Sequence, residues 1–319
     1  MNYLLADLGG THLRLAQSQN DKVQLVEKLV CADFDSLEAA ISYYLNAHPL
    51  PGPRSCCLAV AAPLLGDQVQ MTNSPWNFSL EKLKQGFGFD QLYALNDFEA
   101  IAHAVPHLQD NQLQQLGGSN KDAQGNMAVL GPGTGLGVKH LTFTSTGWKV
   151  LMGEGGHVDF APVDETDLML WQCLQKTQSS VVAEDLLSGR GLLQIYRALC
   201  ASKQTNVEFD DVAEVISAAL SKSCPTSEAS ADQFLRILGS FAGNLALNLN
   251  TTGGVYLCGG VAMALAPMLA ESRFRDRFEA KGRFKNYVAG IPAFLVKEAE
   301  PGLLGALRFL QLHTEKAES

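Results

Sequence analysis

Three glycine-rich turns stand where predicted strands end, and the backbone amides of such turns can bind phosphate. They are DLGGT at residues 7–11, GPGTGLG at residues 131–137 and GGVYLCGG at residues 253–260. Glycine has no Cβ, so its backbone N–H groups can close on phosphate oxygens. None of the turns matches the Walker A or the Rossmann spacing. A hairpin or packing turn accounts for any one of them alone, whereas three in one chain indicate a polyphosphate site.

Two aspartates accompany these turns. Asp7 directly precedes the first pair of glycines, where a carboxylate can hold Mg²⁺ through water. Asn96 and Asp97 follow a predicted strand and precede a helical pattern over residues 100–105. A carboxylate in that position can take the proton of a hydroxyl group as its oxygen attacks phosphorus. The alternative interpretation is that Asp97 only caps the helix.

A second polar group follows the middle turn. Glu154 and His157 enclose two glycines, so acceptors and donors for several hydroxyl groups of a polyol lie within four residues. Glu184 belongs to a stretch that we predict to be helical. The plainer alternatives are a structural histidine at position 157 and a solvated charge at position 184.

Other chemistries lack their motifs in this chain. No second cysteine lies at a ligand spacing from His157 and Cys173, so a structural zinc site is not expected. No G-x-S-x-G turn is present, which disfavours a serine hydrolase of the nucleophile-elbow type.

The elements that must position these residues alternate between strand and helix in the first hundred positions. Apolar and turn patterns predict strands at residues 3–7, 13–16, 23–30, 56–62 and 92–95, and helices at residues 36–47 and 80–87. Asp35 and Glu38 are predicted to form a capping box at the start of the first helix. This alternation indicates an α/β layer.

A polar stretch at residues 109–126 is the predicted domain boundary. We therefore expect a small α/β domain at residues 1–108 and a larger α+β domain at residues 109–300, with helical patterns concentrated at residues 165–249. An amphipathic pattern over residues 302–312 predicts a closing helix. The segment 301–319 is expected to return to the first domain.

Composition narrows the function classes. The 319 residues include 24 Lys and Arg against 33 Asp and Glu, a formal net charge of −9, which disfavours a nucleic-acid partner. No apolar run reaches the length of a membrane span, and the N-terminus does not resemble a signal peptide. Seven cysteines without a C-x-x-C motif are expected to be free thiols. These features predict a cytoplasmic protein with no membrane partner.

In this order the motifs resemble those of the bacterial glucokinase family, within the superfold of sugar kinases, actin and heat-shock chaperones. The resemblance rests on DLGGT, GPGTGLG and GGVYLCGG, together with MTN at residues 71–73 and the following Trp76, NDF at residues 96–98, EGGH at residues 154–157 and AEDLLSG at residues 183–189. It implies a two-domain, actin-like (ribonuclease H-like) α/β fold with a central cleft. The implied activity is the glycolytic transfer of phosphate from ATP, with Mg²⁺, to the 6-hydroxyl of glucose. The family usually works as a cytosolic homodimer.

The resemblance also implies residue roles. Asp97 would be the general base. The substrate-binding residues would be Asn96, Asp97, Glu154, His157 and Glu184. The ATP-binding residues would be Ala6, Asp7, Leu8, Gly9, Gly10, Thr11, Gly133, Thr134 and Gly259. No direct metal ligand is implied, since Mg²⁺ would arrive with ATP and would touch the protein, if at all, through Asp7. His12 and Arg190 depart from the commoner family residues, and neither has a proposed catalytic role.

Two alternatives stay open at this point. The first is a kinase for another hexose, such as mannose, fructose or N-acetylglucosamine. The second is a non-catalytic sugar sensor of the same superfold. A DNA-binding regulator would begin with a basic helix-turn-helix arm, whereas this sequence opens on the strand of the first phosphate turn.

Overall fold

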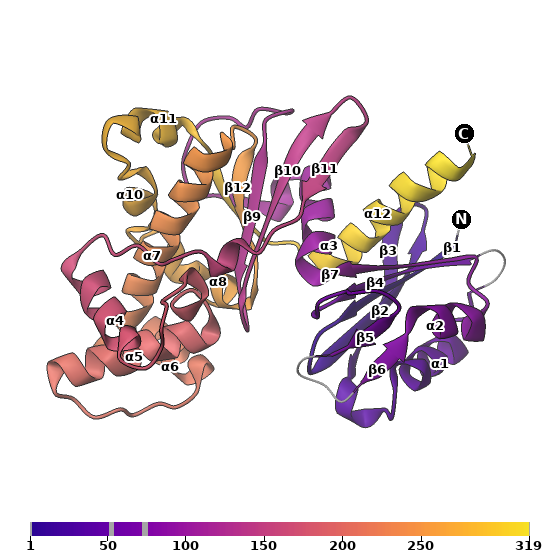
Figure 1. Ribbon diagram of the computed structural model, residues 1–319, viewed down its shortest axis with the longest axis horizontal. Helices are drawn as coiled ribbons and strands as arrows, with labels where there is room; N and C mark the ends of the chain where they lie inside the picture. The colour runs from indigo at the N-terminus through magenta and orange to yellow at the C-terminus, as the bar shows by residue number, and fades with distance from the viewer. Residues whose placement is uncertain (1, 51–53, 72–75, 319) are drawn as a thin grey trace. The chain divides into compact units, whose positions relative to one another are not determined.

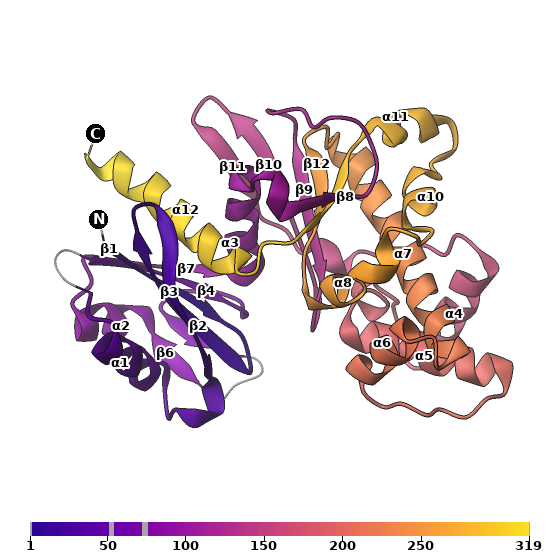
Figure 2. The same ribbon diagram turned by 180° about the vertical axis from the view of Figure 1, so that it is seen from behind.

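The computed structural model describes residues 2–50, 54–71 and 76–318, with side chains as far as Thr314, and its chain divides into two compact units. Unit 1 combines Met1–Leu108 with Glu298–Ser319, and unit 2 is Gln109–Lys297. The C-terminal segment thus belongs to the same unit as the N-terminus. Figures 1 and 2 show the elements of each unit from opposite sides.

Unit 1 is built on a five-stranded sheet of order β3-β2-β1-β4-β7. Strands β1, β2 and β3 pair antiparallel, whereas β4 pairs parallel with both β1 and β7. The strands are β1 (Asn2–Leu8), β2 (His12–Gln19), β3 (Lys22–Val30), β4 (Arg54–Val60) and β7 (Gln91–Asn96). A separate small hairpin joins β5 (Gln68–Gln70) to β6 (Asn77–Ser79).

Both faces of this sheet are covered by helices. The helices are α1 (Leu37–Ala47), α2 (Leu80–Phe87), α3 (Asp97–Ala104) and α12 (Pro301–Glu318). Alternate residues of β1 enter different cores: Leu4 joins the core that holds residues of α1 and α2, and Leu5 joins the core that holds residues of α3 and α12. This period of two, with apolar side chains on both faces, explains why β1 is almost uniformly buried.

Local capping residues set the helix starts. The Ser36 side chain accepts a hydrogen bond from the backbone N–H of Ala39, so Ser36 is the N-cap of α1. The predicted capping box of Asp35 and Glu38 was therefore wrong by one residue. Helix α2 has the predicted bounds, because Ser79 caps its start and Gly88, in the left-handed region at φ 61°, ends it.

Unit 2 contains a six-stranded mixed sheet of order β11-β10-β9-β12-β13-β8. Strand β12 pairs parallel with β9 and β13, and the remaining neighbours pair antiparallel. The strands are β8 (Leu113–Gln115), β9 (Met127–Pro132), β10 (Leu136–Thr144), β11 (Gly147–Leu151), β12 (Gly254–Leu257) and β13 (Ala293–Val296).

The helices of unit 2 pack around α7, whose 25 residues run through the core. Sixteen of those residues are buried, which makes α7 the scaffold of this unit (Figure 1). The helices are α4 (Glu165–Gln175), α5 (Gly189–Lys203), α6 (Val212–Leu220), α7 (Pro225–Leu249), α8 (Gly260–Ala264), α9 (Ala266–Leu269), α10 (Phe274–Glu279) and α11 (Lys285–Gly290).

Six short 3₁₀ turns complete the described elements: η1 (Cys31–Asp33), η2 (Val105–His107), η3 (Asp110–Gln112), η4 (Gly155–His157), η5 (Ala183–Asp185) and η6 (Gly282–Phe284). Two of them, η4 and η5, carry residues singled out in the sequence. Among the helices of the described ranges, none has both the length and the apolar character of a membrane span.

Candidate active site

Strand register in unit 1 brings the first glycine turn and Asp97 to one edge of the sheet. Leu8, Val60 and Asn96 lie in register across β1, β4 and β7. These three strands are parallel, so their carboxyl ends share an edge, which is where α/β sheets bind ligands. The turn after β1 and the start of α3 after β7 therefore face the same space within unit 1.

The surroundings of Asp7 shift its pKa. Burial raises its pKa to about 6, the Arg14 guanidinium opposes that rise, and the nearby carboxylates Asp97 and Glu300 add to it. Arg14 Nη1 lies 3.5 Å from Asp7 Oδ2, and Arg14 Nε lies 2.9 Å from Glu300 Oε2. A Cβ on Gly302 would come within 3.2 Å of the Asp7 carboxylate, so the first turn of α12 also covers it. Asp7 and Glu300 thus share one guanidinium, and Asp97 is a third carboxylate close to Asp7.

Asn96 and Asp97 share the start of α3. The backbone N–H of Phe98 donates to Asn96 Oδ1 at 3.1 Å and to Asp97 Oδ1 at 2.9 Å. Asn96 is the N-cap, and Asp97 is the first helical residue. The alternative of a purely capping Asp97 is therefore only partly right, since the cap position belongs to its neighbour.

The first glycine turn is a tight hairpin between β1 and β2. The N–H of Gly9 donates to the carbonyl of His12 at 2.9 Å, and Thr11 is exposed. A Cβ on Gly9 would meet nothing closer than that same carbonyl, at 3.4 Å, an ordinary contact. The side chains of Ala6 and Leu8 are buried in β1, so these two residues can offer a ligand only their backbone. The fold itself does not require glycine at position 9.

The second and third glycine turns meet in unit 2. Strands β9 and β12 are parallel, and Leu130 is in register with Leu257, so both turns leave the same edge of the sheet. Gly259 has φ +87°, and a Cβ there would lie 2.5 Å from the carbonyl oxygen of Pro132. Around Gly133, in contrast, a Cβ would find no atom within 4 Å. Packing explains the glycine at 259 and does not explain the one at 133.

Glu184 lies against the second glycine turn. The backbone N–H of Leu136 donates to Glu184 Oε2 at 2.8 Å, and a Cβ on Gly135 would come within 2.6 Å of the same oxygen. Glu184 belongs to the 3₁₀ turn η5, so the predicted helical stretch was wrong at this position. One backbone bond, from the N–H of Gly189 to the carbonyl of Gly133 at 2.8 Å, ties the next residues to the same turn.

Glu154 and His157 are both exposed at the ends of the EGGH segment. Glu154 Oε1 lies 3.5 Å from Nζ of the buried Lys139, and the same Nζ donates to the carbonyl of Gly153 at 2.8 Å. His157 ends η4, where its N–H donates to the Glu154 carbonyl at 3.1 Å. Lys139 therefore anchors the EGGH segment through its buried ammonium group, while the side chains of Glu154 and His157 stay accessible.

Backbone pairing joins the two polar segments of unit 2. The N–H of Ala183 donates to the carbonyl of Val158 at 2.9 Å, and Asp159 and Val182 form a β-bridge. The structure thus assembles Gly133, Thr134, Gly259, Glu154, His157 and Glu184 within unit 2. It assembles Ala6, Asp7, Leu8, Gly9, Gly10, Thr11, Asn96 and Asp97 within unit 1.

An apolar pocket of about 610 Å³ adjoins the glycine turns of unit 2. Helix α6 lines it with Val212, Ile216 and Leu220, and α8 lines it with Gly260 and Val261, among others. A Cβ on Gly189 would touch the Gly133 carbonyl at 3.4 Å, Val212 at 3.7 Å and Val261 at 3.9 Å. Gly133 is therefore close to the pocket wall.

The MTN motif lies partly outside the described residues, since Thr72 and Asn73 fall in the range 72–75. Its described neighbours Met71 and Trp76 are both buried in unit 1, and Trp76 Nε1 donates to the carbonyl of Phe34 at 3.2 Å.

Within the described ranges, no cluster of three or more His, Cys, Asp or Glu side chains could hold a metal ion. The residues around Asp7 nevertheless fit a cation delivered with its own ligands. Mg²⁺ in phosphoryl-transfer sites keeps water and phosphate oxygens and takes one or two carboxylates from the protein. Burial and the charges of Asp97 and Glu300 raise the Asp7 pKa, and such a cation would oppose that rise.

Three charged residues of the site were missed in the sequence: Arg14, Lys139 and Glu300. A signal existed for Arg14, because a hairpin that turns at Gly9 and Gly10 pairs Asp7 with Arg14 across the two strands. For Lys139 the signal was a charged residue within an otherwise apolar strand, a position where a lysine usually has a specific partner. Glu300 precedes the closing helix, and nothing in its neighbourhood points to Arg14.

Known proteins resemble this chain over nearly its whole length. The family model described as Glucokinase matches residues 4–313. The glucokinase of Colwellia psychrerythraea is 42% identical over 314 residues, covering 96% of this chain and 95% of that protein. The glucokinase of Neisseria meningitidis serogroup C is 42% identical over 313 residues, with 97% and 95% covered.

Solved structures are similar over the same extent. A glucokinase from an Antarctic psychrotroph has a TM-score of 0.87 at 36% identity, covering 97% of this chain and 98% of that one. The Balamuthia mandrillaris glucokinase, solved in complex with glucose, has a TM-score of 0.78 at 25% identity, with 96% and 92% covered. The predicted α/β, actin-like fold class is confirmed. The chain belongs to the glucokinase family, whose activity, the ATP-dependent phosphorylation of glucose, is the activity of this protein.

Proposed function

We propose that this protein phosphorylates glucose at its 6-hydroxyl with Asp97 as the general base. The observation that carries the proposal is the position of Asp97: it starts α3 at the sheet edge that also carries the DLGGT turn. A base must lie within hydrogen-bond reach of the proton that it removes, and the phosphoryl donor must be nearby. One sheet edge of unit 1 offers both the carboxylate and the phosphate turn.

The chain's other polar residues would orient the sugar. Asn96 uses its Oδ1 as the cap of α3, so its amide nitrogen is the group that would donate to a hydroxyl. Glu184 holds the Leu136 amide with Oε2, and its Oε1 would accept from the sugar. Glu154 and His157 are exposed: the Glu154 carboxylate would accept hydrogen bonds, and the His157 ring can donate or accept them. Together these residues hold the hydroxyls that are not reacting, which is how a kinase positions its acceptor.

For ATP, we propose that the base enters the apolar pocket beside α6 and α8 and that the phosphates reach Gly133 and Thr134. Two observations support this path. A Cβ on Gly189 would contact the wall residues Val212 and Val261, and the N–H of Gly189 donates to the Gly133 carbonyl. No packing contact accounts for glycine at 133, whereas a close approach of phosphate to backbone N–H would account for it. Asp7, Gly9, Gly10 and Thr11 would contribute the second set of phosphate contacts.

Mg²⁺ bound with ATP would neutralise phosphate charge and polarise the transferred phosphoryl group. In this proposal Asp7 holds that ion through water, and Arg14 and Glu300 keep the Asp7 carboxylate in place. The role of the protein is thus to fix one carboxylate where the metal and phosphates arrive.

A homodimer and a cytoplasmic location are part of the proposal and rest on the family resemblance. All seven cysteines are free in the structure, as expected of a reducing compartment. Sedimentation velocity at several protein concentrations tests the dimer, because a single species of one chain's mass at all of them would contradict it.

The direct test is ADP release from purified protein with Mg²⁺-ATP and glucose, mannose, fructose, N-acetylglucosamine or no sugar. The expected result is release with glucose well above every other sugar. Preference for another hexose would mean that Glu154, His157 and Glu184 select that sugar, and the proposed mechanism would be unchanged. A folded, nucleotide-binding protein without sugar-dependent release would be the sugar sensor.

A further inference from the structure

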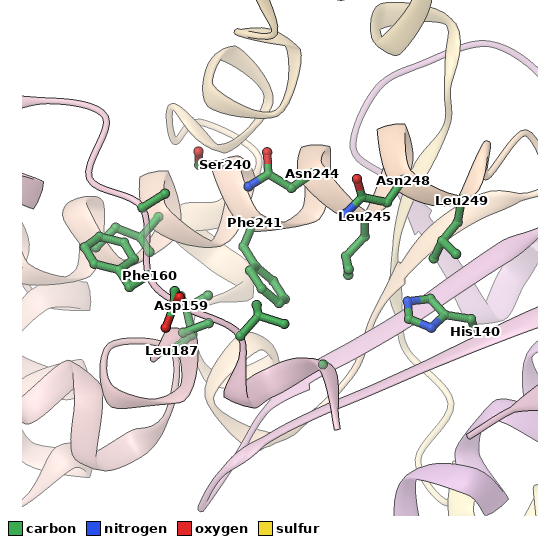
Figure 3. A pocket seen from close by; sticks show the side chains of 15 residues that line it. His140, Asp159, Phe160, Leu187, Ser240, Phe241, Asn244, Leu245, Asn248 and Leu249 are labelled. Carbon is green, nitrogen blue, oxygen red and sulfur yellow. The ribbon is translucent and has the colours of Figure 1, made fainter. Parts of the chain in front are cut away.

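A second pocket of unit 2 lies behind the sugar-side segments. It encloses about 330 Å³, which is within the size range of small-molecule sites. The pocket lies between α7, strand β10 and the chain that follows EGGH (Figure 3). Its apolar wall includes Phe160, Leu187, Ile237, Phe241 and Leu245. None of the residues assigned above to glucose or ATP lines it.

One polar group in this pocket is an unsatisfied hydrogen-bonding atom. His140 Nε2 is buried and, within the described part of the chain, has no hydrogen-bond partner. Burial, together with the charge of Lys139, lowers the His140 pKa, so the imidazole is neutral near pH 7. A neutral imidazole carries one donor and one acceptor nitrogen. A hydroxyl group can both donate and accept, so it satisfies Nε2 in either tautomer.

The polar groups on the opposite wall come from α7. Ser240, Asn244 and Asn248 follow one another at helical spacing and line the same pocket (Figure 3). Asp159, at the end where Phe160 and Leu187 lie, is the charged carboxylate of the lining. Because hydroxyl and amide groups outnumber charges here and the rest of the wall is apolar, the pocket suits an uncharged ligand.

The pocket wall is continuous with the sugar-binding segments. Gly155 lines the pocket and directly follows Glu154, and Ala183 lines it and directly precedes Glu184. Lys139, the neighbour of His140 on β10, holds Gly153 and Glu154. A molecule that fills the pocket would therefore press on the backbone that carries three of the proposed glucose ligands. Coupling between two sites needs such a shared element.

We propose that this pocket binds an uncharged molecule of one or two fused rings that bears a hydroxyl group, and that its occupancy changes the affinity for glucose. The ring packs beside Phe241 and Leu245, and the hydroxyl bonds His140 Nε2. The coupling half of the proposal rests on the proposed glucose contacts of Glu154, His157 and Glu184. The binding half is independent of them.

The first experiment measures binding without sugar or nucleotide. Isothermal titration of the full chain with 2-naphthol, and with naphthalene as the matched probe without a hydroxyl, is expected to give tighter binding of 2-naphthol by about five- to tenfold. His140→Phe keeps the ring and removes the nitrogens, so the two probes should then bind equally. The proposal fails if the wild-type protein shows no saturable binding of either probe. It also fails if His140→Phe still prefers 2-naphthol over naphthalene by the wild-type factor.

A variant that fills the pocket controls for nonspecific binding. Ala161 is exposed and lines the pocket, so Ala161→Trp should abolish probe binding. Ala201→Trp, at an exposed position of α5, is the matched control and should leave it unchanged. Equal loss in both variants would contradict the assigned location. Sedimentation velocity on Ala161→Trp identifies the remaining alternative, because dissociation of an oligomer would show that a second copy, not a small ligand, covers the pocket.

The second experiment measures glucose affinity with and without saturating 2-naphthol. The expected result is a change by the same factor by which glucose changes 2-naphthol affinity, since coupling is reciprocal. If glucose binds and neither affinity changes, the coupling half fails. If glucose neither binds nor is phosphorylated, the proposed function fails, and the titrations without sugar still decide the binding half.

Discussion

Asp7 of unit 1 and Glu184 of unit 2 both stand beside glycine-rich turns, yet their carboxylates are held in opposite ways. Asp7 is mostly buried, with two further acids nearby and one arginine 3.5 Å away, and burial raises its pKa to about 6. Glu184 accepts a 2.8 Å hydrogen bond from the Leu136 backbone, and the turn beside it needs glycine at 135 to make room.

The difference separates two ways of building a site. The Asp7 surroundings disfavour its ionised form, through burial and two nearby carboxylates, and a bound cation would favour that form. Glu184 already has a protein partner at Oε2, so this carboxylate is also part of the scaffold. A site residue can therefore be poised for a ligand or built into the fold, and the following variants distinguish the two.

The largest effect on activity is expected for Asp97→Asn, which changes a residue that we assign to the ligand rather than to the fold. Asparagine still accepts the Phe98 N–H at the start of α3, while the base is lost. We expect kcat to fall by about 10²–10⁴-fold with a glucose KM changed by less than about threefold. Steady-state kinetics with glucose as the varied substrate measure this. A variant with most of its kcat would remove Asp97 as the base.

Gly259→Ala and Gly133→Ala form a matched pair, because the fold requires glycine at position 259 and does not require it at position 133. Position 259 combines φ +87° with a 2.5 Å approach to the Pro132 carbonyl, so alanine there should lower the free energy of unfolding by about 3 kcal/mol. Position 133 has open space, so alanine there should leave stability unchanged and raise the KM for ATP. Urea unfolding and ATP kinetics of both variants test the pair. Equal destabilisation of the two would contradict the assignment of Gly133 to the ligand.

Asp7→Asn should increase stability at neutral pH while reducing activity. The folded pKa of about 6 lies above the ordinary value of 3.8, so ionised Asp7 destabilises the folded state by about 3 kcal/mol at pH 7. The wild-type protein regains that stability as the pH falls from about 6 to about 4, and the difference from the variant vanishes there. Melting temperatures of both proteins between pH 4 and pH 7.5 measure it. A variant less stable than wild type at pH 7 would contradict the sign.

The smallest effect is expected at Glu184. Glu184→Gln keeps an acceptor for the Leu136 N–H and should change the free energy of unfolding by less than about 0.5 kcal/mol, whereas Glu184→Ala leaves that N–H without its acceptor and should cost about 1 kcal/mol. Both should weaken glucose binding. Thermal unfolding together with glucose titration separates the two roles, and equal stability of Gln and Ala variants would show that the hydrogen bond does not support the turn.

Local signals were sufficient for much of unit 1. Helix α2 was predicted over its observed range, and the structure shows that Ser79 and Gly88 are the local residues that end it. The strand–turn–strand around Gly9 followed from apolar alternation and a pair of glycines. The start of α1 was displaced by one residue because Asp35, Ser36 and Glu38 offer competing caps, and only the backbone conformation selects Ser36. At Glu184 the apolar pattern suggested a helix, and the contact with Leu136, 48 residues away, favours a 3₁₀ turn.

Sequence patterns were enough to predict the α/β class, the family membership suggested by seven short motifs, and the candidate residues, because turn chemistry and residue type are local properties. The tertiary structure alone decided which charges meet. Arg14 contacts Glu300, which lies 286 positions further along the chain, and Glu184 contacts the second glycine turn. Neither contact has a local signal, since a carboxylate's partner and its pKa depend on what strand register and helix packing bring within a few ångströms, and on how much water they remove.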